Sequence, residues 1–185
     1  MRVHQYYFMQ EEEEKETMSN IVLIGFMGVG KGTIARALVK KSDMFGVDTD
    51  DLIESMENRK VKTIFSENGE EYFRALEAKT AKWLSKNVKN SIISTGGGFF
   101  KVDKLEKIGT VVYLRSSFDG IIERLNAQPN AKKKFKKRPL LNDIKKAKKL
   151  FAQRAPLYEA KADIVVHVEK MSVDKIVAKI LKEAK

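Results

Sequence analysis

Short apolar runs alternate with longer amphipathic segments from Asn20 to the C-terminus. The apolar runs have the length of buried strands, and the segments between them follow the 3.6-residue period of helices. Strands that alternate with helices in this way are typical of a parallel sheet covered by helices. The pattern therefore predicts an α/β fold with strands at residues 21–24, 45–47, 92–94, 110–114 and 164–168.

Amphipathic helices are expected between these strands. One follows a glycine-rich segment and covers about residues 31–41, and another runs through Ile53 and Met56. A further helix has residues near a 3.6-residue period, which predicts a stripe facing the core, with Trp83 as a packing residue rather than a ligand platform. The residues of this stripe are Phe73, Leu76, Thr80, Trp83 and Leu84.

The length of 185 residues and the 43% content of hydrophobic residues suit one domain with a buried core. We expect residues 1–19, with their run of glutamates, to be a flexible extension and residues 20–185 to be the folded domain. The acidic N-terminus does not resemble a signal peptide, and no apolar run approaches the roughly 18 residues that cross a membrane. The absence of cysteine excludes disulfides, thiolate metal sites and a cysteine nucleophile, and it suits a cytoplasmic protein.

The formal net charge of +11 favours an anionic ligand. Residues 1–17 contain two basic and five acidic residues, so residues 18–185 carry +14. Nucleotide phosphates and nucleic acid would both suit such a charge, and a solvated lysine-rich surface is the simplest interpretation. Composition by itself does not choose among them.

Residues 25–33 read Gly-Phe-Met-Gly-Val-Gly-Lys-Gly-Thr and match the P-loop pattern G-x-x-x-x-G-K between a strand and a helix. Glycines let successive N–H groups converge on phosphate oxygens, and the helix N-terminus adds partial positive charge. Lys31 supplies a full charge for the outer phosphates. The pattern predicts ATP binding by Gly25, Gly28, Val29, Gly30, Lys31, Gly32 and Thr33.

Gly32 stands where this pattern normally has a serine or threonine that ligates Mg²⁺. Thr33 is one residue later, about 100° further around the helix, so its hydroxyl need not replace the missing one. We still expect a requirement for Mg²⁺, held by ATP oxygens, water molecules and a carboxylate.

Two carboxylates follow the second predicted strand. If that strand ends at Val47, Asp48 and Asp50 lie on the same side of an extended chain and can both face a ligand. One would then steady the water shell of Mg²⁺, and the other would orient or deprotonate an attacking hydroxyl. Either residue could instead cap the next helix, and the residues alone leave both roles open.

Two arginines are candidates for binding an anionic substrate. Arg74 lies four residues after Glu70 and three before Glu77, a spacing that favours an ordinary ladder of surface ion pairs. An arginine held by Glu77 could also form a fork for a substrate carboxylate. Arg154, on or beside the helix before the last strand, would usually be a surface residue.

Two loops complete the candidates. Residues 94–98 read Ser-Thr-Gly-Gly-Gly directly after a strand, which predicts a substrate-contact loop at Gly96, Gly97 and Gly98. Residues 127–138 carry six positive charges and no negative one. They suit a solvated charge run, a nucleic-acid contact or a lid that closes over a triphosphate, with Arg138 at its base.

Together these segments closely resemble the shikimate kinase family, through GFMGVGKGT, VDTDDLIE, EEYFRALE, STGGG, KRPLL and RAPLY in the family's order. The resemblance covers nearly all of residues 20–185. It implies an α/β three-layer sandwich with a five-stranded parallel sheet, a P-loop kinase of the nucleoside-monophosphate-kinase type, with a lid and a mobile substrate-binding helical region. It also implies ATP-dependent phosphorylation of the shikimate 3-hydroxyl, a step of aromatic amino-acid biosynthesis.

The resemblance implies a role for each candidate. Lys31 would bind the phosphates, Asp50 would contact the substrate hydroxyls as base or positioner, and Arg138 would stabilise phosphoryl charge from the lid. Asp48 would hold Mg²⁺ through water, and no direct ligand can be carried over to Gly32. Glu77 would orient Arg74. The carboxylate and ring of shikimate would be bound by Arg74, Arg154, Gly96, Gly97 and Gly98.

Other functions remain open at this point. Residues 30–33 also resemble the loop of adenylate kinase, and gluconate kinases share the wider fold, but the DTD and STGGG segments suit a polyol acid. Nucleic-acid binding is disfavoured because Phe135 is the lone aromatic residue of the basic segment. We expect a small-molecule substrate, no nucleic-acid or membrane partner, and a monomer.

Overall fold

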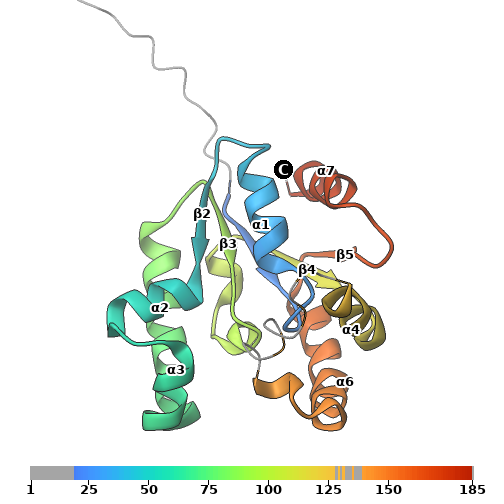
Figure 1. The fold of residues 1–185 in the computed structure, drawn as a ribbon. Coiled ribbons are helices and arrows are strands. Elements are labelled where there is room, and N and C mark those ends of the chain that lie inside the picture. Colours follow the sequence, from blue (N-terminus) through green and yellow to red (C-terminus); the bar gives the residue numbers. More distant parts are fainter. Residues whose placement is uncertain (1–18, 128, 130, 132–134, 136–138, 185) are drawn as a thin grey trace, which may run out of the picture.

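A computed structural model describes residues 19–127, 129, 131, 135 and 139–184. The expectations for residues 1–18 and for most of the segment 127–138 therefore lie outside the described residues. The described chain forms one parallel sheet with the strand order β2-β3-β1-β4-β5 (Figure 1). The strands are β1 (Ile21–Ile24), β2 (Phe45–Asp48), β3 (Ser91–Ser94), β4 (Thr110–Arg115) and β5 (Ile164–His167).

The predicted fold class is confirmed, and the strand boundaries agree with the apolar runs to within about one residue. Strands β1 and β3 are buried along their whole length, which explains why they read as continuous apolar runs rather than alternating ones. The main helices are α1 (Lys31–Val39), α2 (Thr49–Glu57), α3 (Val61–Asn87), α4 (Phe118–Asn126), α6 (Ile144–Lys161) and α7 (Val173–Glu183).

The central strand β1 places the phosphate-binding loop at the middle of one sheet edge. It pairs with β3 on one side and β4 on the other, and β2 pairs with β3. Because all these strands are parallel, residues 25–30 and Thr95, which follow β1 and β3, meet Asp48, the last residue of β2, at the same edge. Helices α1 and α7 pack against each other, and α6 packs against β4 (Figure 1).

Helix α3 has an internal break at Gly69, with φ 81° and ψ 178°. This combination is accessible essentially to glycine alone, so the residue separates a short N-terminal helical segment from a longer one. In the longer segment, Phe73 and Leu76 pack with Ile53 of α2, and Ala81 and Leu84 join the core that contains the sheet. The predicted stripe is correct except at Trp83, which is 49% exposed, because the buried face runs through Glu77 and Ala81 instead.

No helix within the described ranges is long and apolar enough to cross a membrane.

Candidate functional site

The phosphate-binding loop has the backbone conformation that its glycines permit. Gly25, Gly28 and Gly30 have φ values of +143°, +86° and +108°, which residues with a side chain rarely adopt. Gly30 is the N-cap residue of α1 and no side chain caps this helix. Uncapped N–H groups at a helix N-terminus are suited to bind an anion.

Lys31 is directed back over the same loop. Its ammonium group donates to the carbonyl oxygens of Gly25, at 2.6 Å, and Phe26, at 3.3 Å, and the residue is buried. The charge is therefore held at the mouth of the loop before any nucleotide binds. Thr33 is exposed on α1, in agreement with the expectation that its hydroxyl need not replace one at position 32.

Arg124 supports this loop and was not predicted from the sequence. Its guanidinium donates to the Val29 carbonyl at 2.6 Å and to the Val168 carbonyl at 2.9 Å, so it joins the loop to the segment after β5. A side chain at Gly30 would come within 3.0 Å of the same guanidinium. The sequence contains little to find Arg124, because it is a single arginine on an amphipathic helix.

The two aspartates do not share an extended segment, so that part of the prediction is wrong. Strand β2 ends at Asp48 and α2 begins at Thr49, which places Asp50 in the first helical turn. Asp48 caps this helix, accepting the N–H of Asp50 at 3.0 Å. Of the two roles left open by the sequence, capping belongs to Asp48, and the helix turns Asp50 toward the glycine loop after β3.

Asp50 and Glu77 each contribute to the site one carboxylate oxygen that has no hydrogen-bond partner. Within the described chain, Asp50 Oδ1 and Glu77 Oε1 are buried and make no hydrogen bond. Burial, together with the charges of Asp48 and Glu77, raises the pKa of Asp50 to about 6, although Lys31 acts in the opposite direction. Buried polar atoms without partners are costly, so both oxygens are suited to accept from hydroxyl donors of a ligand.

Arg74 is held between two glutamates, as the spacing predicted. Its Nη1 forms a short ion pair with Glu77, which is 1% exposed, and its Nε and Nη2 both donate to Glu70 Oε1, at 3.0 and 2.9 Å. Burial lowers the pKa of Arg74, but the hydrogen bonds and charges of Glu77 and Glu70 outweigh it and raise the pKa. Burial of Glu77 raises its own pKa despite the nearby arginine.

The side chains of Asp50 and Arg74 approach the glycine loop after β3 closely. Two positions of this loop therefore have no room for a side chain larger than hydrogen. A Cβ atom at Gly96 would lie 2.7 Å from Asp50 Oδ1, and one at Gly98 would overlap the guanidinium of Arg74. Neither glycine has a positive φ value, so close approach rather than backbone conformation requires glycine here. The sequence predicted close approach of a ligand, and the structure shows that protein side chains also use this space.

Three elements hold this loop in place. Gly96 N donates to Thr49 Oγ1 at 3.1 Å, and Thr95 Oγ1 donates to the Leu23 carbonyl at 2.8 Å. From α6, Arg154 Nη1 and the Tyr158 hydroxyl both donate to the Gly97 carbonyl, at 3.1 and 2.6 Å. Thr49 and Thr95 lie in the segments VDTDDLIE and STGGG, which carry the family resemblance. Their hydrogen bonds join residues far apart in the chain and could not be predicted.

Arg154 is 8% exposed, so the expectation of an ordinary surface arginine is wrong. Tyr158, one helical turn later, is buried between the rings of Tyr113 and Phe100, at centroid distances of 5.3 and 4.5 Å. Burial raises the pKa of Tyr158 to about 12, which keeps its hydroxyl a hydrogen-bond donor at neutral pH. Both residues therefore contact the glycine loop that Asp50 and Arg74 also approach.

Two predicted features are not placed by this geometry. Arg138 and most of the basic segment 127–138 lie outside the described residues, so the lid remains a prediction. The described residues also contain no group of three or more acidic, histidine or cysteine side chains that could hold a metal ion.

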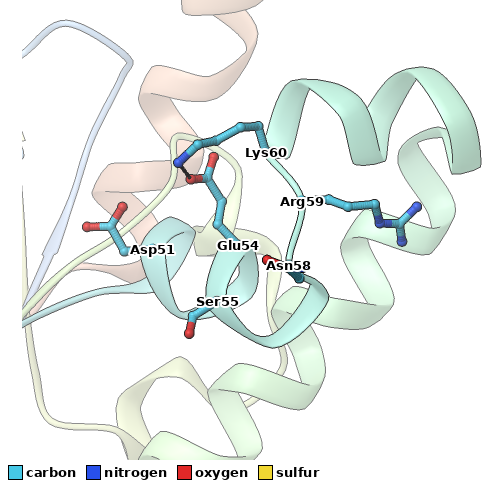
Figure 2. A pocket seen from close by; sticks show the side chains of 6 residues that line it. All are labelled: Asp51, Glu54, Ser55, Asn58, Arg59 and Lys60. Carbon is cyan, nitrogen blue, oxygen red and sulfur yellow. Dashed lines mark hydrogen bonds and ion pairs between the residues drawn. The ribbon is translucent and has the colours of Figure 1, made fainter.

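A separate surface pocket of about 360 Å³ lies on α2 and the turn after it (Figure 2). Three of its charged residues, Glu54, Arg59 and Lys60, are already paired. Glu54 accepts from Lys60 Nζ at 2.5 Å and from Val61 N at 2.9 Å, and the guanidinium of Arg59 is paired with Glu57 and Glu67. None of the predicted site residues lines it. The pocket therefore has no part in the site built around Lys31 and Asp50.

The arrangement combines a phosphate-binding loop with a polar site for a small anion that carries hydroxyl groups, and comparisons with known proteins agree with it. The sequence profile of the shikimate kinase family matches residues 27–185. A shikimate kinase of Helicobacter hepaticus is 39% identical over 150 residues, covering 81% of this chain and 87% of that protein.

Solved structures give the same result. A shikimate kinase from Acinetobacter baumannii in complex with shikimate has a TM-score of 0.78 and 29% identity, covering 90% of this chain and 93% of that one. A shikimate kinase from Aquifex aeolicus has a TM-score of 0.72 and 32% identity, covering 89% and 95%. The protein belongs to the shikimate kinase family, and it is a kinase that phosphorylates shikimate.

Proposed function

We propose that the chain transfers the γ-phosphoryl group of ATP to the 3-hydroxyl of shikimate by means of the residues described above. One observation supports this assignment most strongly. Two buried acceptors without partners, Asp50 Oδ1 and Glu77 Oε1, lie beside Arg74. Shikimate has three hydroxyl groups and a carboxylate, so it offers hydrogen-bond donors to the acidic groups and an anion to the arginines.

ATP would bind at the loop of residues 25–33. The N–H groups of the loop and of the first turn of α1 would surround its phosphates, and Lys31 would exchange its carbonyl partners for phosphate oxygens. Gly25, Gly28 and Gly30 would be required for this conformation, and Val29 would be positioned by Arg124. The Met27 backbone lies against Gly97, which brings the phosphates next to the substrate loop.

Asp50 would orient and deprotonate the attacking hydroxyl. Its pKa of about 6 leaves the carboxylate ionised at neutral pH yet close enough to accept a proton. The substrate oxygen would form a bond to the γ-phosphorus while the bond from that phosphorus to the bridging oxygen of ADP breaks. The hydroxyl proton would pass to Asp50. Positioning and electrostatics supply most of the rate in such transfers.

Arg74 and Arg154 would bind the carboxylate, with Glu77 holding Arg74 in place and the glycine loop 96–98 lining the ring. Glu70 now occupies the Nε and Nη2 face of Arg74, so the substrate carboxylate would replace it. Glu70 is 58% exposed, and exposed ion pairs contribute little, so this exchange would cost little free energy.

Mg²⁺ would neutralise charge that develops on the phosphates. Asp48 suits a contact through water, because its Oδ1 caps α2. Arg138 would approach the phosphates from the lid. We further propose that the protein acts as a cytoplasmic monomer without a nucleic-acid or membrane partner.

The carboxylate assignment can be tested with shikimate and its uncharged carboxamide. Calorimetry on the wild type should show the carboxamide binding at least about tenfold more weakly, since it lacks the anion for Arg74. In Arg74→Ala the preference for the carboxylate should fall to the part that Arg154 retains, while ADP affinity stays within about twofold of the wild type. Retention of the full preference for the carboxylate in Arg74→Ala would contradict the assignment.

A further inference from the structure

The carboxyl end of β3 places one serine between the phosphate-binding loop and Asp48. Ser94 is the last residue of this strand and pairs in register with Leu23 of β1 and with Asp48 of β2. Leu23 lies two residues before the loop that begins at Gly25. The serine therefore lies at the sheet edge between the loop expected to bind the phosphates and the aspartate expected near the metal.

The side-chain space of position 32 opens toward this serine. A Cβ atom at Gly32 would lie 4.0 Å from Ser94 Oγ and 3.5 Å from Arg36 Nη1, both ordinary contact distances. A serine or threonine at position 32 has a rotamer choice that could bring its hydroxyl close to Ser94 Oγ. With glycine at position 32, Ser94 Oγ is the hydroxyl that borders this space.

The hydroxyl of Ser94 also differs from its neighbours in its hydrogen bonding. Ser91 Oγ, at the other end of β3, donates to the Lys89 carbonyl at 3.0 Å, and Thr95 Oγ1 donates to the Leu23 carbonyl at 2.8 Å. Ser94 is 5% exposed, and none of the side-chain hydrogen bonds found in the described part of the chain uses its hydroxyl. Its lone pairs are thus available to a ligand.

We propose that the Ser94 hydroxyl is the direct protein ligand of the divalent cation that accompanies the bound nucleotide, in place of the side chain that Gly32 lacks. The proposal rests on the function proposed above, because the cation arrives with the nucleotide. A neutral oxygen donor suits Mg²⁺, which keeps several waters and needs few protein ligands. Asp48 pairs in register with Ser94 across β2 and β3 and would hold one of those waters.

Arg36 is the competing occupant of the same space, since its guanidinium borders the Gly32 position. If Arg36 substituted for the metal, loss of the Ser94 hydroxyl would leave cation affinity unchanged. The two alternatives therefore differ in a measurable quantity.

The experiment is a titration of Mn²⁺ into the enzyme–ADP complex, followed by the electron paramagnetic resonance signal of free Mn²⁺. Ser94→Ala should weaken Mn²⁺ binding at least about tenfold. ADP affinity in the presence of a chelator should stay within about twofold of the wild type, because the hydroxyl acts on the cation. Ser91→Ala is the matched control, with an equally buried serine on the same strand, and should bind Mn²⁺ like the wild type.

Rescue gives the sharper result. Adding Gly32→Ser to Ser94→Ala should restore Mn²⁺ affinity to within about threefold of the wild type, whereas Gly32→Ala in the same background should not, because it adds a methyl group without a hydroxyl. The space at Gly32 and its ordinary backbone conformation permit both changes. Where Ser94→Ala does not fold, Ser94→Thr and Ser94→Val give the same comparison.

Unchanged Mn²⁺ affinity in Ser94→Ala, or equal rescue by Gly32→Ala and Gly32→Ser, would overturn the proposal. Failure of the wild type to bind ADP would instead overturn the proposed function, so the two failures are distinguishable.

Discussion

The phosphate-binding loop and the substrate half of the site meet at one edge of the sheet but satisfy their polar groups differently. The substrate half consists of Asp50, Arg74, Glu77, Arg154 and the loop 96–98. In the phosphate loop, Lys31 already donates to loop carbonyls and Arg124 holds the Val29 carbonyl. In the substrate half, two carboxylate oxygens are buried without a partner.

Because of this difference, the two regions contribute differently to ligand affinity and to the stability of the fold. The phosphate loop is stable before its ligand arrives, so its residues contribute mainly to nucleotide affinity. The substrate half keeps ionised groups partly desolvated, which costs folding free energy but leaves acceptors ready for the substrate. Changes in the substrate half should therefore reduce catalysis or substrate affinity while leaving nucleotide affinity nearly unchanged, and some of them should stabilise the fold.

The largest effect is expected for Asp50→Asn. Loss of the proton acceptor should lower kcat by about 10²- to 10⁴-fold, while ATP affinity changes less than about twofold. Steady-state kinetics with calorimetry for ATP measure both quantities, and Asp51→Asn, an exposed neighbour on the same helix, is the control. Near-wild-type turnover in Asp50→Asn would remove Asp50 from the reaction.

The next largest effect is a difference in shikimate affinity between variants of two adjacent glycines. Gly98→Ala should weaken shikimate binding by about 10- to 100-fold, because the new methyl group must displace the Arg74 guanidinium. Gly97→Ala should have a much smaller effect, since its methyl group would meet the Met27 backbone at 3.6 Å, an ordinary contact. Equal shikimate affinities in the two variants, measured by calorimetry, would show that the approach of Arg74 to the loop is unimportant.

A third effect concerns stability and its dependence on pH. The pKa of Asp50 is raised from 3.8 to about 6 in the folded protein, so the folded state binds its proton more tightly than the unfolded state does. The wild type should therefore lose stability as pH rises from about 4 to about 6, by at most about 3 kcal/mol.

Asp50→Asn should remove this loss and raise the free energy of unfolding by about 1–2 kcal/mol at pH 7.5, with almost no gain at pH 4.5. Urea unfolding at the two pH values measures the difference. A variant that is less stable than the wild type at pH 7.5 would show that the Asp50 carboxylate is not destabilising.

The smallest effect is expected at the edge of the substrate half. Glu70→Gln should tighten shikimate binding about two- to fivefold, because Glu70 competes with the substrate carboxylate for Arg74, and an exposed ion pair contributes up to about 1 kcal/mol. Glu71→Gln, also exposed, is the control for the change of net charge. Weaker binding in Glu70→Gln would mean that Glu70 supports Arg74 instead of competing with the substrate.

Much of this protein can be predicted from its sequence, because the signals are local. The phosphate loop needs glycines and a lysine at fixed spacing between a strand and a helix, and all of these are consecutive in the chain. The buried strands appear as apolar runs for the same reason. The ion pairs of Arg74 with Glu70 and Glu77 follow from helical spacing alone.

Only the tertiary structure decided how far each polar group is desolvated and which partners it has. Burial of Arg154 and Glu77, the position of Arg124 against Val29, and the exposure of Trp83 all depend on which elements pack together. The strand order places Ser94 between Leu23 and Asp48, residues more than 40 positions away in the chain. Local sequence carries backbone conformation and helical spacing, whereas burial and long-range contacts arise only when distant segments share one core.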